Sequence, residues 1–222
     1  MKGKLTHMKN LILLVVAVAV LLFTFGAPTS CATGISLNVS IDTSGLSTSP
    51  GSEIFFIFTD GSGTGDANNT ATLTTFALGG GSVGAVDIAN TFGGASGDMS
   101  STVFLTDSSF TSVLAETFSA GASLSFLLNL TTNVDAGGTP DQFSIAIADP
   151  SGTLISTSDP TGFDNLFVIN LDSASPSPST YSSSVTLSSP GPVTTPEPGT
   201  IFLLTVGLAA IALYSKRLTT LS

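Results

Sequence analysis

The chain has 222 residues, only 9% of which are charged, and a formal net charge of −10. A typical soluble protein is about 25% charged. The chain has one Cys, one His and no Trp. It therefore cannot form an internal disulfide framework, and its length suits one domain with additional segments.

All basic residues lie at the two ends of the chain, whereas the fifteen acidic residues lie between Asp42 and Glu197. The basic residues are Lys2, Lys4, Lys9, Lys216 and Arg217. The region between them cannot form side-chain salt bridges with itself, and its negative field repels nucleic acids and anionic lipids. We therefore expect no nucleic-acid partner.

The same distribution excludes most catalytic chemistry from the central region. The only His is His7, so a Ser or Cys nucleophile would have no imidazole base. Schiff-base chemistry needs Lys, and most zinc sites need His or Cys. We expect that the protein is not an enzyme. A hydrolase that uses paired carboxylates is kept as a remote alternative.

Residues 1–32 have the pattern of a secretory signal peptide. Three Lys in residues 1–10 precede the apolar run 11–25, and small residues follow up to Ala32. We expect export by the Sec machinery and cleavage after Ala32. Two alternatives stay open. In the first, the segment is retained as an anchor. In the second, Cys31 is lipidated, although Pro28 occupies the position where a lipoprotein signal has an aliphatic residue.

Residues 196–222 contain a second apolar segment. A short transmembrane helix is predicted over about residues 200–215, and Lys216 and Arg217 begin the basic tail 216–222. These bases favour a cytoplasmic end, which places the acidic region on the opposite side of the membrane. About 14 apolar residues reach roughly 21 Å, short of a hydrocarbon core of roughly 30 Å. The segment therefore suits a temporary sorting signal better than a permanent anchor.

The residues Pro196, Glu197, Pro198 and Gly199 stand directly before this helix. A Pro-Glu-Pro motif, a short apolar helix and a basic cluster, in this order, resemble the PEP-CTERM sorting signal of Gram-negative bacteria. The resemblance implies that an exosortase is a partner and that the C-terminal helix holds the precursor in the membrane before processing. It also implies a final location at the cell surface or in the extracellular matrix. A Pro-rich stalk before an ordinary anchor is the alternative.

Between the two ends, alternating apolar and polar residues predict an all-β fold. The alternation occurs in residues 35–41, 122–130, 143–147 and 167–171. The apolar run Ile54–Phe58 predicts a strand buried on both faces. Weaker strands are predicted near residues 71–78, 101–106, 153–157 and 181–187. We expect a single β-sandwich, jelly-roll-like, over residues 33–172 or extending to 189.

Three other segments have distinct local patterns. Asp-Pro-x-Gly sequences at residues 149–152 and 159–162 predict type I turns. The apolar spacing in residues 110–118 predicts a short helical turn with its cap at residue 107 or 108. The Ser/Thr/Pro-rich residues 173–195 predict an extended stalk.

One Gly-rich loop has oxygen-bearing side chains at Asp60, Ser62, Thr64 and Asp66. Hard cations such as Ca²⁺ bind oxygen clusters of this type, so the loop is a candidate Ca²⁺ site. It is not an EF-hand, because position twelve of such a loop would be Ala71. A flexible polar hairpin loop without a metal is the alternative.

Residues 104–110, 121–126 and 139–143 are similar to a PEP-CTERM ectodomain family that has no assigned activity. Export, the sorting tail and the sparse catalytic side chains predict a structural or adhesive protein of an exopolysaccharide or biofilm matrix. The alternative is a lectin-like module that binds extracellular polysaccharide, because β-sandwiches host many lectins. Against it, the chain has no Trp, and Tyr181 and Tyr214 lie in the stalk and tail.

Overall fold

The computed structural model describes residues 34–46, 51–61, 63, 65–135 and 138–190. All regular elements in these ranges are β-strands, and no helix among them is suited to crossing a membrane. The predicted signal peptide and the predicted C-terminal helix lie outside the described residues. The chain divides into two units, Met1–Leu187 and Ser188–Ser222, and the sheets belong to the first apart from the last residue of the last strand.

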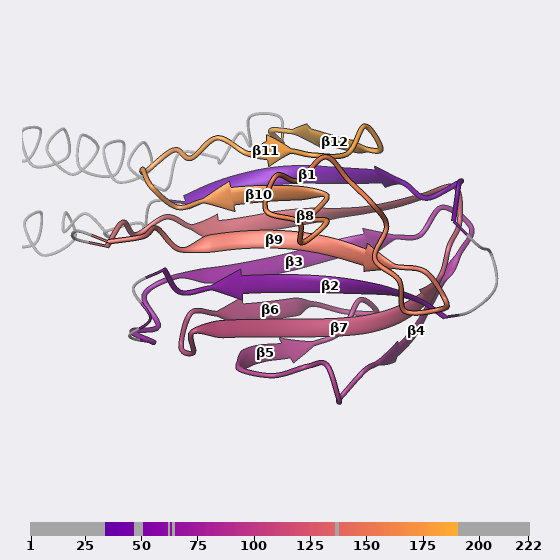
Figure 1. The fold of residues 1–222 in the computed structure, drawn as a ribbon, viewed down its shortest axis with the longest axis horizontal. Helices are drawn as coiled ribbons and strands as arrows, with labels where there is room; N and C mark the ends of the chain where they lie inside the picture. Colours follow the sequence, from indigo (N-terminus) through magenta and orange to yellow (C-terminus); the bar gives the residue numbers. More distant parts are fainter. Residues whose placement is uncertain (1–33, 47–50, 62, 64, 136–137, 191–222) are drawn as a thin grey trace, which may run out of the picture. The chain divides into compact units, whose positions relative to one another are not determined.

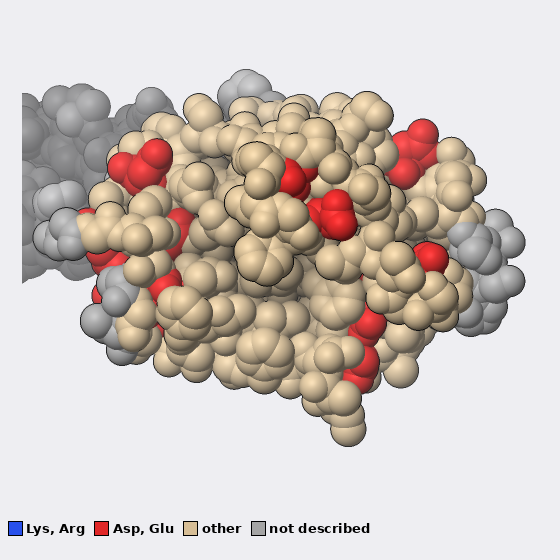
Figure 2. Space-filling view, in the orientation of Figure 1, with Lys and Arg blue, Asp and Glu red and all other residues tan. Residues whose placement is uncertain are grey.

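The described strands form two six-stranded sheets, in which the registered pairs are antiparallel (Figure 1). The first sheet contains, in spatial order, β12 (Val185–Ser188), β1 (Gly34–Asp42), β8 (Ser123–Thr131), β3 (Thr70–Ala77), β6 (Val103–Thr106) and β5 (Gly94–Gly97). The second contains β11 (Ser179–Thr180), β10 (Phe167–Asn170), β9 (Gln142–Ala148), β2 (Ser52–Thr59), β7 (Thr111–Ser119) and β4 (Ser82–Val86). The predicted all-β, sandwich-like fold is confirmed. In Figure 2 the described residues of this face include acidic side chains and no Lys or Arg.

The strands pair in a nested order along the chain. β1 pairs with β8, β2 with β7, and β3 with β6. The first and third of these pairs lie in the first sheet, and β2–β7 lies in the second. β9 then adds to the second sheet by pairing with the other edge of β2. This order brings loops that are distant in sequence to the same end of the sandwich.

Side-chain alternation accounts for the strands that the sequence predicts most clearly. In β1, Val39 and Ile41 are buried, whereas Asn38, the residue before Val39, is exposed. The register with β8 sets Val39 opposite Phe126 and Ile41 opposite Leu124, so both strands turn their apolar residues to one face. The predicted strands at residues 122–130, 143–147 and 167–171 are confirmed as β8, β9 and β10.

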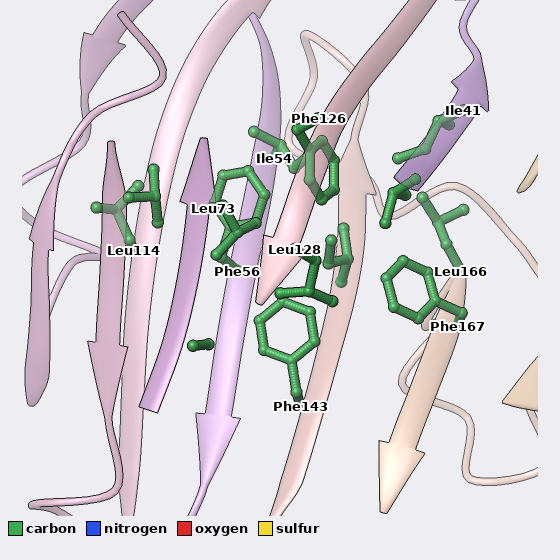
Figure 3. Close-up of a cluster of buried hydrophobic side chains, with 14 of the residues drawn as sticks. Ile41, Ile54, Phe56, Leu73, Leu114, Phe126, Leu128, Phe143, Leu166 and Phe167 are labelled. Atoms are coloured by element: carbon green, nitrogen blue, oxygen red, sulfur yellow. The ribbon is translucent and has the colours of Figure 1, made fainter. Parts of the chain in front are cut away.

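The core lies between the two sheets, where both contribute apolar side chains (Figure 3). Phe56 of β2 is fully buried and meets two phenyl rings from the opposite sheet. Its ring centroid lies 6.0 Å from that of Phe76 and 5.9 Å from that of Phe126, both in edge-to-face geometry. Aromatic pairs in this geometry contribute beyond the area they bury. Phe56 therefore holds the two sheets together near the centre of the core.

The prediction that β2 is buried on both faces is wrong for its outer face. Ile54, Phe56 and Phe58 are fully buried toward the core, but Phe55 and Ile57 are only half-buried. β2 has neighbours on both edges, β7 and β9, so the run is central in the sheet. Its outer face borders a surface groove and is not completely covered.

The predicted helical turn at residues 110–118 is also wrong, because this segment forms β7. Leu114 and Phe118 are both buried and four residues apart, and this spacing fits both a helix and one face of a strand, whereas Phe110 precedes β7 and is exposed. Eight residue pairs with β2 satisfy the backbone of the segment as a strand. Long-range pairing therefore decides between two local structures that the sequence pattern allows.

Both predicted turns are closed by a backbone hydrogen bond. The Gly152 amide donates to the Asp149 carbonyl at 2.9 Å, and the Gly162 amide donates to the Asp159 carbonyl at 3.2 Å. In the first turn the Asp149 carboxylate also accepts the Thr153 amide at 3.0 Å. The turn chemistry in the sequence was therefore sufficient to locate these loops.

The weaker strand predictions have mixed outcomes. Those near residues 71–78 and 101–106 are confirmed as β3 and β6, whereas residues 153–157 form only an isolated bridge at Leu154. β4 and β5 were not predicted, because both contain Gly and lack a clear alternation. β11 and β12 fall within the Ser/Thr/Pro-rich segment and add edge strands to the two sheets. β12 partly confirms the strand predicted near residues 181–187, and its Val185 and Leu187 are half-buried against the core.

We predict that Phe56→Ala lowers the free energy of unfolding by about 3–5 kcal/mol, because it leaves a cavity between the two sheets. The matched control is Phe163→Ala, since Phe163 is 71% exposed. Urea unfolding of both variants at constant pH measures the difference. Equal losses in the two variants would contradict this assignment of the core.

Candidate functional site

Three loops of the chain, which join β2 to β3, β6 to β7 and β8 to β9, meet at one end of the sandwich. The last residue of β2, Thr59, pairs with the first residues of β7 and β9, Thr111 and Gln142. The first residue of β3, Thr70, pairs with the last residue of β6, Thr106. In Figure 1 this is the left-hand end, and acidic atoms lie at the same end in Figure 2. Acidic residues from separate loops therefore come together here.

Three of these acidic residues form a compact cluster. Asp60, Asp135 and Asp141 each present one carboxylate oxygen, and the three oxygens lie within 4.8 Å of one another. Asp60 is 0% exposed and Asp141 is 2% exposed, whereas Asp135 is half-buried. Asp60 follows β2, Asp135 lies between β8 and β9, and Asp141 precedes β9. We call these three residues the Asp triad.

Glycine allows the loop after β2 to approach the loop before β9. A Cβ atom at Gly61 would collide with the carbonyl oxygens of Thr139 and Pro140. Because Gly61 has none, its amide reaches Asp141 and donates to Oδ1 at 2.9 Å. Any larger residue at position 61 would separate the two loops and pull Asp60 away from Asp141.

The loop then folds back on Asp60. The Gly63 amide donates to Asp60 Oδ1 at 2.8 Å, and the Gly65 amide donates to Asp60 Oδ2. Both glycines have positive φ, 71° and 64°, which is costly for residues with a Cβ. Asp60 is therefore fixed by backbone amides rather than by a basic side chain.

Asn69 connects the Asp triad to a fourth buried carboxylate. Its Nδ2 donates to Asp141 Oδ2 at 2.8 Å, and its backbone amide donates to Asp107 Oδ2 at 2.9 Å. Its Oδ1 accepts the Asn133 amide at 2.8 Å. Asn69 and Asp107 are both fully buried. Asn69 thus bridges the two acids, with its side-chain amide on Asp141 and its backbone amide on Asp107.

Asp107 has a strongly perturbed acidity. Burial, followed by the adjacent carboxyl of Asp141, raises the pKa of Asp107 to about 7, against the opposing effect of the Asn69 amide. Desolvation and a nearby like charge both disfavour the ionised form. Two buried carboxylates in contact are therefore a source of electrostatic strain in this structure.

Three oxygens in this region are buried and accept no hydrogen bond. They are Oδ1 of Asp107, Oδ2 of Asp135 and Oδ1 of Asn68. The Asn68 amide nitrogen, in contrast, donates to Asp135 at 2.6 Å and to Asp66 at 2.7 Å. An ionised carboxylate and an amide oxygen can only accept. Neighbouring carboxylate and amide oxygens therefore cannot donate hydrogen bonds to these three atoms.

No positive side chain compensates this charge within residues 34–190, since the sequence has no Lys, Arg or His between residues 10 and 215. At an effective dielectric constant of about 20, two like charges about 4 Å apart repel by about 4 kcal/mol. A Coulombic contribution from Asp66 adds to the effect on Asp107. The end of the sandwich therefore concentrates negative charge that no cationic side chain in the described residues offsets.

Of the residues predicted to form a Ca²⁺ loop, Asp60 and Asp66 have different positions relative to the Asp triad. Asp60 belongs to the Asp triad, and Asp66 accepts the Asn68 side chain just outside it. Ser62 and Thr64 lie outside the described residues. The sequence analysis missed Asp107, Asp135 and Asp141. The available signal was that Asp107 and Asp141 directly adjoin strand ends, but their meeting depends on strand pairing.

A second feature is a groove of about 650 Å³ on the outer face of the second sheet. Half-buried Phe55 and Ile57 of β2 contribute to its lining, and the largely exposed Phe110 and Phe163 lie beside it. Its other lining residues are Thr59, Thr111, Gln142, Ser144, Ala146, Gly152, Leu154 and Asn165. None of the lining residues is charged. The groove therefore suits an uncharged ligand with apolar surface and a few polar groups.

Glu116 is a buried acid away from the Asp triad. It is 1% exposed, and its Oε2 accepts the Met99 amide at 2.7 Å. Burial raises the pKa of Glu116, and the Met99 amide partly opposes this shift. Within the described residues no cluster of three acids includes Glu116, so we assign it a structural role.

We predict that Glu116→Gln becomes progressively more stable than the parent protein as pH rises from 4 to 8. The folded-state pKa of Glu116 lies above the unfolded value of about 4.3. Its ionisation therefore costs nothing below the unfolded pKa, and the cost grows as pH rises through the folded pKa. Gln keeps an acceptor for Met99 and does not titrate. Urea unfolding at several pH values measures the difference.

The control for this prediction is Asp42→Asn, whose stability relative to the parent changes with the opposite sign and at lower pH, as pH falls below the ordinary Asp pKa of about 3.9, so the urea series extends below pH 4. The hydroxyl and the amide of Ser44 lower the pKa of exposed Asp42, so its contribution is present above the unfolded pKa and is lost as pH falls. If both variants showed the same pH trend, the assignment of Glu116 would be incorrect.

Comparison with known protein families gives one match, to the PEP-CTERM protein-sorting motif over residues 194–217. The chain carries a PEP-CTERM sorting motif. The matched segment includes the predicted Pro196, Glu197, Pro198 and Gly199 and the basic Lys216 and Arg217, all outside the described residues. Comparisons with curated proteins and with solved structures give no match. The motif implies an exported protein that an exosortase sorts, from a membrane-anchored precursor toward the surface or the outside.

Proposed function

We propose that this protein has a structural or adhesive role in the exopolysaccharide or biofilm matrix of a Gram-negative bacterium. The observation that carries the proposal is the PEP-CTERM motif at residues 194–217. Two further observations support it. The described strands form two sheets with an apolar core between them, and the described residues contain no His, Lys or Cys. These residue types supply most nucleophiles and bases. We accordingly propose that the protein is not an enzyme.

We also propose a jelly-roll-like topology for the sandwich. The nested pairs β1–β8, β2–β7 and β3–β6 support it, as does their alternation between the two sheets. A double Greek key arranges eight strands in this manner. In this scheme β9, β10, β11 and β12 are additions to the edges of the eight-stranded unit.

The sorting part of the proposal predicts a processed product. In a host that encodes an exosortase, the full-length chain should mature into a shorter surface form that has lost residues after the motif. Pro196→Ala combined with Pro198→Ala should leave the unprocessed precursor in the membrane fraction, because the extended motif is altered. Fractionation and mass spectrometry of both termini measure this result.

The matched control replaces two other prolines in the same Pro-rich segment, Pro190→Ala with Pro192→Ala, outside the matched motif. This control should be processed normally. Intact protein in the cytosol, still bearing Met1 and Ser222, would refute the proposed export. For the matrix role, deletion of the gene should reduce surface-attached biomass, and the full-length gene should restore it.

The second candidate function is binding of an uncharged polysaccharide, and the groove over β2 and β9 favours it. The aromatic rings of Phe110 and Phe163 and the polar groups of Gln142 and Ser144 lie around an uncharged lining. A carboxylate-dependent hydrolase is disfavoured, because no Asp or Glu lines the groove and Asp107 and Asp141 are buried.

If the groove binds glycan, Phe110→Ala and Phe163→Ala should each weaken binding by about tenfold or more, equivalent to about 1.4 kcal/mol. Ile88→Ala is the control, because Ile88 is exposed and does not line the groove. A glycan array followed by calorimetry measures the effect. No binding by the unmutated protein, or equal losses in all three variants, would argue against this function.

A further inference from the structure

We propose that the Asp triad, Asp60, Asp135 and Asp141, binds one Ca²⁺ ion, with Asp107 as a fourth carboxylate beside it. This inference goes beyond the proposed surface role and does not depend on it. It also differs from the ligand set that the sequence suggested, because the Asp triad draws on two loops, β2–β3 and β8–β9, and Asp107 belongs to a third.

The donor atoms restrict the class of metal. Every candidate ligand in the cluster is an oxygen, and the described residues contain no His or Cys. Zinc sites rely on nitrogen and sulfur ligands, whereas Ca²⁺ and Mg²⁺ take oxygen. The arrangement therefore favours a hard divalent cation.

The number of carboxylates favours Ca²⁺ over Mg²⁺. Ca²⁺ takes about six to eight oxygen ligands at about 2.3–2.6 Å, so ligands on opposite sides of one ion are about 4.6–5.2 Å apart. Mg²⁺ is usually bound through about one or two carboxylates and keeps several waters. The three carboxylate oxygens of the Asp triad lie within 4.8 Å of one another, which one Ca²⁺ ion can span, and Asp107 lies beside them.

An observation independent of the triad also indicates a cation. The Asp107 side chain is 0% exposed, touches Asp141, and has an oxygen that accepts no hydrogen bond. Within the triad, Oδ2 of half-buried Asp135 is also buried and accepts no hydrogen bond. Buried acceptors normally have a partner, and leaving a charged one without any is costly. A bound cation would satisfy acceptors that no side chain in residues 34–190 can neutralise.

The surrounding donors orient the carboxylates and leave capacity for an ion. Asp141 accepts one hydrogen bond each from Gly61 and Asn69, and Asp60 accepts one each from Gly63 and Gly65. A carboxylate has about four lone-pair sites, so the two bonds from Gly61 and Asn69 do not saturate Asp141. Second-sphere hydrogen bonds of this kind orient the ligands of metal sites.

The first test is direct binding to the full-length protein, purified in mild detergent and treated with EDTA. Calorimetric titration with CaCl₂ should give one ion per chain, with a Kd of about 0.1–1 mM, as in extracellular modules. At 10 mM CaCl₂ the Tm should rise by about 3–10 °C, whereas MgCl₂ at the same concentration should give a clearly smaller shift.

The second test uses isosteric variants, Asp107→Asn and Asp135→Asn. The new amide of Asp107→Asn can donate to Asp141 while its oxygen keeps the Asn69 bond, so repulsion in the cluster falls. In EDTA both variants should melt at or above the Tm of the parent. In 10 mM CaCl₂ they should melt below it, with Ca²⁺ affinity reduced at least about tenfold. A purely structural role for these acids would not produce this reversal.

Asp149→Asn is the matched control. Asp141 and Asp149 flank the two ends of β9, roughly 20–25 Å apart, so the control changes the net charge equally without touching the cluster. It should keep the full Ca²⁺ response.

Four results would overturn the proposal: no Ca²⁺ binding by the unmutated protein, an equal response to Mg²⁺, loss of the response in Asp149→Asn, or an unchanged response in the two cluster variants. If a variant does not fold, the stoichiometry and selectivity of the unmutated protein still decide. Correct export with no Ca²⁺ binding would refute this site and leave the proposed matrix role intact.

Discussion

The dominant physical constraint on the described domain is that its carboxylates have no cationic side chain to pair with. In residues 34–190 every ionised Asp or Glu depends on water, backbone amides or side-chain donors. Exposed acids meet this need locally, as Asp149 does by accepting amides of its own turn. Buried acids cannot do so as easily, since desolvation penalises the charged form. Several acids meet at the end of the sandwich, and backbone donors there do not satisfy all of their carboxylate oxygens.

The topology of the sandwich creates that cluster. Nested pairing returns the ends of β2, β6 and β8 and the starts of β3 and β9 to one end of the sheets. Gly61 then permits a backbone approach that no other residue would allow. The apolar core fixes the positions of these strands, and Phe56 lies at its centre. The position of the Asp triad therefore depends on packing in a remote part of the domain. The fold does not depend on these acids for its stability.

Sequence patterns predict the parts of this fold that depend on local chemistry. Period-two alternation located β1 and β8, and Asp-Pro-x-Gly located two turns, because burial of one face and turn geometry are both encoded within a few residues. The spacing of Leu114 and Phe118 fits a helix and a strand equally, and only pairing with β2 selects the strand. The same limit applies to the site. Asp60 stood out within its Gly-rich loop, but Asp135 and Asp141 join it through register, which no local pattern reveals.

The sorting motif and the candidate ion site lie in separate parts of the chain, residues 194–217 and 60–141, yet they impose compatible conditions. A site with a Kd near 0.1–1 mM fills only where Ca²⁺ is abundant, as it is around extracellular modules of this affinity. The motif directs the chain to that side of the membrane. Before export, like charges in the cluster would remain uncompensated and would weaken the folded state. On the proposed assignment, the ion then adds stability in proportion to its concentration. The domain would thus gain stability after export, without a disulfide and without a basic residue.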